Sequence, residues 1–113
     1  MADLNLLGYG PHVLVASNDY YVKAVGGGPT RSRKLIVSVN RTAGSLSFLS
    51  KGERADADVA LEAQSYVDAA GTTAATAISG DKTVTIDATG KQIVIRTDGS
   101  FTGDVQLEIV REQ

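Results

Sequence analysis

The only histidine in the chain, His12, is the residue that a hydrolytic site would have to use as its general base. A serine nucleophile needs such a base within hydrogen-bond reach, and a third group that orients the base. His12 stands beside Pro11, and the chain has no Gly-x-Ser-x-Gly nucleophile elbow. The sequence therefore predicts a loop histidine in a protein that is not an enzyme.

A glycine-rich basic segment spans residues 26–34 and reads Gly-Gly-Gly-Pro-Thr-Arg-Ser-Arg-Lys. Successive backbone N–H groups beside cations can cradle a phosphate. The segment lacks the Gly-Lys-Ser/Thr ending of a P-loop, and no helical pattern follows it. We interpret Arg31, Arg33 and Lys34 as contacts for an acidic protein partner, and a solvated crossover between strands is an equally good interpretation.

Aspartates and tyrosines suggest two further kinds of site. The aspartates do not follow the spacing of a calcium loop, and Asp98-Gly99 and Gly103-Asp104 are typical of turns. We therefore expect no metal and no cofactor. A sugar ring could stack on Tyr20 or Tyr21, but adjacent strand residues point to opposite faces, so one of the two is expected in the core.

Composition narrows the possible functions. The 113 residues are enough for one domain, and the absence of cysteine excludes disulfides and thiolate metal sites. The net charge of −2 gives no basic field to attract nucleic acid or an anionic membrane. The N-terminus lacks the basic region of a signal peptide, and no apolar run is long enough to span a bilayer. We expect a protein made in the cytoplasm.

Apolar and polar residues alternate through most of the chain, and a period of two predicts short strands with one buried face. We expect residues 13–15 and 20–25 to form a hairpin, and the last three strands to form a meander. Leu49 breaks the alternation of its strand. The pattern predicts an all-β fold, an antiparallel β-sandwich of jelly-roll type with about eight short strands. The expected strands cover residues 13–25, 33–39, 45–50, 82–87, 91–97 and 104–111, and residues 72–78 fit a thin strand or a linker.

Two segments are less clear. Residues 56–70 fit a strand and a helical stripe equally well, and the all-β surroundings favour the strand. Residues 1–12 are expected to form an irregular N-terminal arm before a single domain of residues 13–113. This arm is too apolar for a free tail, so we expect a partner to cover Leu4, Leu6, Leu7 and Tyr9.

The inward positions of the expected strands define an aliphatic core, since the chain has no tryptophan and few aromatic residues. The predicted core residues are Leu35, Val37, Val39, Leu46, Phe48, Val84, Ile86, Ile93, Ile95, Val105, Leu107 and Ile109.

The C-terminal sequence contains a strand, an Ala88-Thr89-Gly90 turn, a second strand, a Thr102-Gly103 loop and a third strand. Together with the segment 35–48, this pattern resembles small β-sandwich virion proteins of tailed bacteriophages, over about the last eighty residues. The resemblance implies a capsid decoration (cement) protein, or a related head or tail component, and no functional residues transfer from such families.

This resemblance implies a non-enzymatic virion protein that binds the major capsid protein or another virion protein and stabilises the head. We expect a homo-oligomer, most simply a trimer, anchored by the N-terminal arm, because several copies multiply weak contacts. The alternative is a carbohydrate- or receptor-binding module of a phage fibre or tail.

Overall fold

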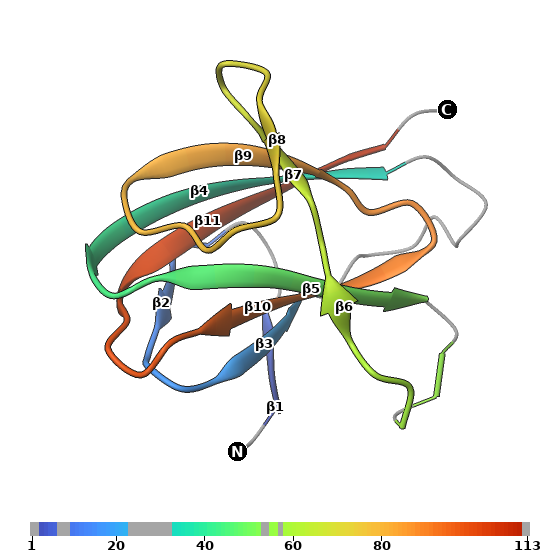
Figure 1. Cartoon of the computed structure of the whole chain (residues 1–113), viewed down its shortest axis with the longest axis horizontal. Helices are drawn as coiled ribbons and strands as arrows, with labels where there is room; N and C mark the ends of the chain where they lie inside the picture. Colours follow the sequence, from blue (N-terminus) through green and yellow to red (C-terminus); the bar gives the residue numbers. More distant parts are fainter. Residues whose placement is uncertain (1–2, 7–9, 23–32, 53–54, 57, 112–113) are drawn as a thin grey trace.

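Two β-sheets face each other in the computed structural model, which describes residues 3–6, 10–22, 33–52, 55–56 and 58–111 (Figure 1). Sheet A contains, in spatial order, β1 (Asp3–Leu6), β3 (Asp19–Val22), β10 (Lys91–Thr97), β5 (Leu46–Gly52) and β6 (Glu62–Ala63). Sheet B contains β2 (His12–Leu14), β11 (Thr102–Arg111), β4 (Arg33–Ala43), β9 (Lys82–Asp87), β7 (Tyr66–Asp68) and β8 (Thr73–Ala74). The described residues form no helix, so the predicted all-β sandwich is confirmed.

The strand pairs are nested, which identifies the sandwich as a jelly roll. β2 pairs with β11, β3 with β10, β4 with β9, and β5 with β6, all antiparallel. Successive pairs fall into opposite sheets, and the pairs β4–β11 and β5–β10 complete each sheet. Eight strands therefore build the jelly roll. The remaining three strands extend its edges: β1 lies parallel to β3, and β7 and β8 follow β9.

The predicted C-terminal meander is wrong, although the extents of β9 and β10 are confirmed. β9 and β11 lie in sheet B, whereas β10 lies between them in sequence but in sheet A. Alternation shows that a strand buries one face, and both sheets of a sandwich bury a face in the same core. The pattern therefore cannot distinguish a hairpin from a crossover between sheets. The prediction of a loop at Thr102-Gly103 is also wrong, because both residues belong to β11, where the register shifts.

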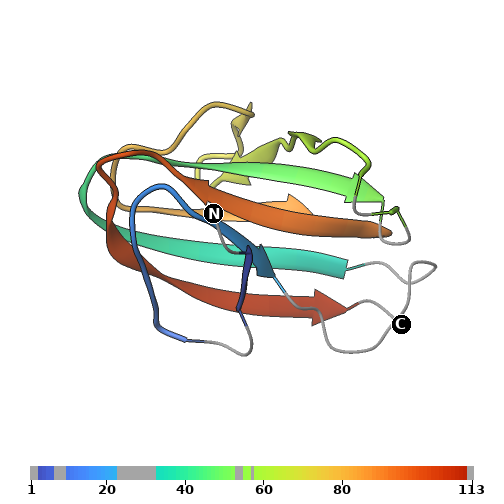
Figure 2. The same cartoon turned by 90° about the horizontal axis from the view of Figure 1, so that it is seen from below.

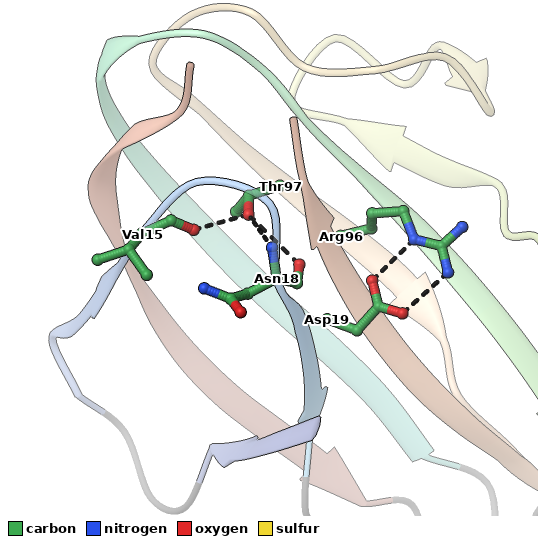
Figure 3. Close-up of polar contacts among 5 residues, drawn as sticks. All are labelled: Val15, Asn18, Asp19, Arg96 and Thr97. Carbon is green, nitrogen blue, oxygen red and sulfur yellow. Dashed lines mark hydrogen bonds and ion pairs between the residues drawn. The ribbon is translucent and has the colours of Figure 1, made fainter. Parts of the chain in front are cut away.

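The hairpin predicted over residues 13–25 is also wrong, because β2 belongs to sheet B and β3 to sheet A (Figure 2). A corner at residues 15–18 redirects the chain, and Thr97 at the end of β10 holds it (Figure 3). The Thr97 hydroxyl donates to the Val15 carbonyl at 2.7 Å and accepts the Asn18 N–H at 3.1 Å. The Thr97 N–H also donates to the Asn18 carbonyl at 3.0 Å.

Replacing Thr97 with valine is expected to lower the free energy of unfolding by about 1–3 kcal/mol. Thr97 is buried, so valine fills the same volume but leaves the Asn18 N–H and the Val15 carbonyl without their hydroxyl partner. Denaturant unfolding measures the change. A Thr97→Ser variant keeps the hydroxyl and should lose less; if the serine and valine variants are equally stable, the hydroxyl does not hold the corner.

The two unclear segments also have defined conformations. Residues 56–70 contain two short strands, β6 and β7, and the helix is excluded within the described residues. Gln64 and Ser65 lie between these strands, where the chain passes from sheet A to sheet B. The prediction of an irregular arm over residues 1–12 is wrong at β1 and at the start of β2. The edge of β3 offers hydrogen-bonding groups to residues 3–6, which pair with it.

The predicted core is confirmed except for Ile109, which is only partly buried where it packs against the core cluster. The cluster also contains residues that the strand pattern did not assign to it, because they lie at corners, in turns or in short strands. These additional core residues are Leu14, Tyr66, Ile78, Ala88 and Phe101, and Tyr20 is the buried member of the predicted tyrosine pair.

Candidate interaction surface

The contact residues predicted from sequence fall in two different sheets. Leu4 and Leu6 lie in β1 at the edge of sheet A, and Arg33 and Lys34 begin β4 in sheet B. Lys34 is exposed and lies opposite Asp87 in the register. Leu7, Tyr9 and Arg31 lie outside the described residues.

The outer face of sheet A carries an apolar stripe across its centre. In the register, Tyr21 of β3, Val94 of β10, Leu49 of β5 and Ala63 of β6 form one row. Their neighbours Tyr20, Ile93, Ile95 and Phe48 belong to the core, and successive strand residues point to opposite faces, so this row points outward. Tyr21 and Leu49 are half-buried, whereas Val94 is fully covered. We call these four residues the A stripe.

Two sequence features indicate the A stripe. Leu49 breaks the alternation of β5, and Ile93, Val94 and Ile95 form a continuous apolar run in β10. An uninterrupted apolar strand is typical of a strand that is covered on both faces. The A stripe was not predicted from the sequence, although the break in alternation at Leu49 is a signal of it.

An ion pair borders the A stripe on one side. The Arg96 Nε and Nη2 atoms donate to the two carboxylate oxygens of Asp19 at 2.7 and 2.8 Å (Figure 3). The two residues are opposite each other in β10 and β3. The Arg96 side chain is 49% exposed and that of Asp19 12%. The hydrogen bond from Arg96 lowers the pKa of the Asp19 carboxyl, and burial opposes this only in part.

Because the pKa of Asp19 is lower in the folded chain, its ionised form stabilises the fold at neutral pH. This contribution is present above the ordinary aspartate pKa of about 3.9 and is lost as the pH falls through the folded pKa. We expect Asp19→Asn to unfold more easily at pH 7 and to lose less stability on acidification than the wild type. Urea unfolding between pH 7 and pH 2 measures both. Arg96→Gln should show the same two changes, because it removes the other member of the ion pair. If the double variant lost the sum of the two single effects, the Asp19 and Arg96 side chains would not be coupled.

Sheet B has a different outer face. Asp104, Gln106 and Glu108 of β11 point outward, because Val105 and Leu107 are core residues. Glu108 lies beside Ile36 of β4, then Thr85 of β9 and Val67 of β7 in one row. Ile36 is half-buried, and Val67 and Val110 are each 40% exposed. We call Ile36, Val67, Val110, Glu108 and Asp104 the B face.

The tyrosines do not form a stacking platform among the described residues. Tyr20 is buried, as predicted for one of the adjacent pair, and its hydroxyl accepts the Val15 N–H at 2.8 Å. Tyr66 is also buried, and its hydroxyl donates to the Thr76 carbonyl. Tyr21 alone of these three presents a half-buried ring at the surface, whereas Tyr9 lies outside the described residues.

The aspartates in turns accept hydrogen bonds from their own loops. The Asp98 carboxylate accepts the Ser45 and Ser100 N–H groups and the Ser45 hydroxyl, each at 2.9 or 3.0 Å. Asp98 is therefore a turn residue, as predicted, but Gly103-Asp104 lies within β11. In the described part of the chain, no three histidine or acidic side chains gather as metal ligands, and no helix could cross a membrane. His12 is half-buried in β2, so the predicted loop position is wrong.

A polar groove of about 540 Å³ lies at the end of the sandwich where β5 ends and β10 begins. Its lining includes Ser50, Gln64 and Lys91. The buried Gln64 Oε1 accepts the Ser50 hydroxyl at 2.7 Å and the Lys91 ammonium at 3.3 Å, and Gln64 Nε2 donates to the Ser65 carbonyl at 3.0 Å. These polar groups pair with one another, so the cluster closes this end of the core.

Comparisons with known proteins give one structural likeness. No protein-family model matches the chain, and no curated protein matches it in sequence. The crystal structure of the SPBc2 prophage-derived protein YomS is similar, with a TM-score of 0.54 and 15% sequence identity. The alignment covers 89% of this chain and all of that one. The likeness shows a shared fold.

Proposed function

We propose that the protein is a non-enzymatic structural component of a phage virion, and that it decorates the outer surface of the capsid and stabilises the head. The observation that carries the proposal is the fold likeness to a prophage-derived protein along the whole length of that protein. The nested jelly roll supports it, because viral capsid proteins recur on this architecture. Fold alone does not define function, so the proposal also depends on the surfaces.

The surfaces support a role in protein contact. Both sheets expose apolar side chains on their outer faces, and the edge strand β2 exposes Val13, with Val15 exposed just beyond it. Interfaces of proteins combine such apolar patches with a polar rim. The partner we propose is the major capsid protein or another virion protein, with no nucleic acid and no membrane. Several copies of the chain, most simply three, would multiply weak contacts with a symmetric shell.

Particles from the strain that encodes the chain provide the test. We expect peptides of the protein in the mass spectrum of purified particles, and antibody-gold label over the heads in electron micrographs. Absence of the protein from purified particles would overturn the proposal. Label confined to fibres or tail tips would overturn the capsid role and favour the receptor- or carbohydrate-binding alternative.

A test of the contact residues proposed from sequence needs a variant that leaves both sheets intact. Removing residues 2–10 would also remove β1 from sheet A, so failure to bind would have two explanations. A double variant, Leu7→Ser with Tyr9→Ser, keeps the β1 sequence intact. We expect it to keep the wild-type unfolding midpoint and to bind particles that lack the protein less well than the wild type. Full occupancy would show that these two residues do not anchor the chain.

A further inference from the structure

We propose that copies of this chain associate head to tail, with the A stripe of one copy against the B face of the next. The inference deepens the proposed function, because it rests on the homo-oligomer proposed there and names the surfaces that form it.

The A stripe has the composition of the centre of an interface. Tyr21 and Leu49 are partly exposed on either side of the fully covered Val94, so the outer surface of the sheet is apolar there. Tyrosine and arginine are enriched where interfaces hold most of their binding energy, and Arg96 borders the stripe with half of its side chain exposed. An apolar sheet face of this kind can pack against a second sheet face.

The charges on the two faces are complementary. Beside the A stripe, Arg96 and Lys51 point outward, and Asp19 is the only described acidic side chain among these outward positions of β3, β5 and β10. On the outer face of sheet B, Asp104, Glu108 and Asp87 point outward with Lys34. These positions of sheet A thus carry two cations and one anion, whereas those of sheet B carry three anions and one cation.

This difference in charge favours a second copy in head-to-tail orientation. Two A stripes facing each other would bring cations against cations, and two B faces would bring carboxylates against carboxylates, which opposes binding. An A stripe on a B face instead joins opposite charges around two apolar centres. Contacts between unlike faces close into a ring when the rotation between copies allows it, and otherwise they extend into an open stack of copies.

The test uses the full chain and two single variants, Leu49→Asp in the A stripe and Ile36→Asp in the B face. We expect the wild type at about 100 μM to sediment as an oligomer, at a multiple of 11.8 kDa. Each variant alone should sediment at the mass of one chain. An equimolar mixture should give dimers and nothing larger, because each dimer joins the one intact A stripe to the one intact B face.

A matched control is Val59→Asp, a change of the same kind at an exposed apolar residue between β5 and β6 and outside both faces, which should keep the oligomer. Circular dichroism must give the wild-type unfolding profile for each variant. A monomeric wild type, or a Leu49→Asp variant that stays oligomeric, would overturn the inference. An Ile36→Asp variant that associates alone would also overturn it, because it would indicate A stripe against A stripe. The particle experiment is independent: protein found on capsids but monomeric in solution would end this inference and leave the proposed function standing.

Discussion

Truncation of Phe48 to alanine is expected to lower the free energy of unfolding by about 3–5 kcal/mol. Phe48 is only 2% exposed and belongs to the core cluster through β5. Its ring meets the ring of Tyr66 edge to face, with centroids 5.7 Å apart and an angle of 71° between the planes. The truncation therefore removes buried apolar surface, leaves a cavity and breaks a ring contact that links sheet A to sheet B.

Urea unfolding at neutral pH measures this effect, with Val13→Ala as the control. Val13 is 76% exposed, so its truncation should change the free energy of unfolding by less than about 0.5 kcal/mol. A loss below about 1 kcal/mol for Phe48→Ala would place Phe48 outside the core. The double variant Phe48→Ala with Tyr66→Ala tests the ring contact. If its loss of unfolding free energy equalled the sum of the two single losses, the rings would not be coupled.

Replacement of Gly44 by alanine is the second large effect that we expect, about 2–5 kcal/mol of destabilisation. Gly44 lies between β4 and β5 with a φ of +73°, in the left-handed region where a side chain is strained. An added Cβ would lie 2.5 Å from the Phe101 nitrogen and 2.6 Å from the Asp98 Oδ1 atom. Both neighbours belong to the tightly hydrogen-bonded Asp98 loop, so the backbone would have to move.

Two other glycines separate strain from steric overlap. Gly71 has a φ of +85° but open space around the added Cβ, so Gly71→Ala should cost only the backbone strain, about 1–2 kcal/mol. Gly80 has neither a positive φ nor a neighbour within 4 Å, so Gly80→Ala should be within about 1 kcal/mol of the wild type. Thermal or urea unfolding should rank the three variants in that order. Equal losses at Gly44 and Gly71 would mean that the Asp98 loop accommodates the methyl group.

Only part of the interaction surface could be predicted from the sequence. Leu49 and the run Ile93-Val94-Ile95 are visible in the sequence, and they indicate strands with apolar groups on both faces. That Leu49, Val94 and Tyr21 share one row depends on which strands are neighbours, and β3, β10 and β5 are far apart in the chain. The ion pair of Asp19 and Arg96 could not be predicted from sequence for the same reason, since 77 residues separate its members.

The amino-acid sequence by itself determined the all-β class, the limits of strands such as β9 and β10, and the aliphatic core around Leu35, Val37 and Phe48. These properties depend on local alternation, which records whether each side chain faces water or apolar neighbours. Only the tertiary structure decided the sheet to which each strand belongs, the added strand β1 and the corner held by Thr97. Strand pairing is made by backbone groups that are the same in every residue except proline, so its choice depends on how the whole core packs and leaves no local pattern in the sequence.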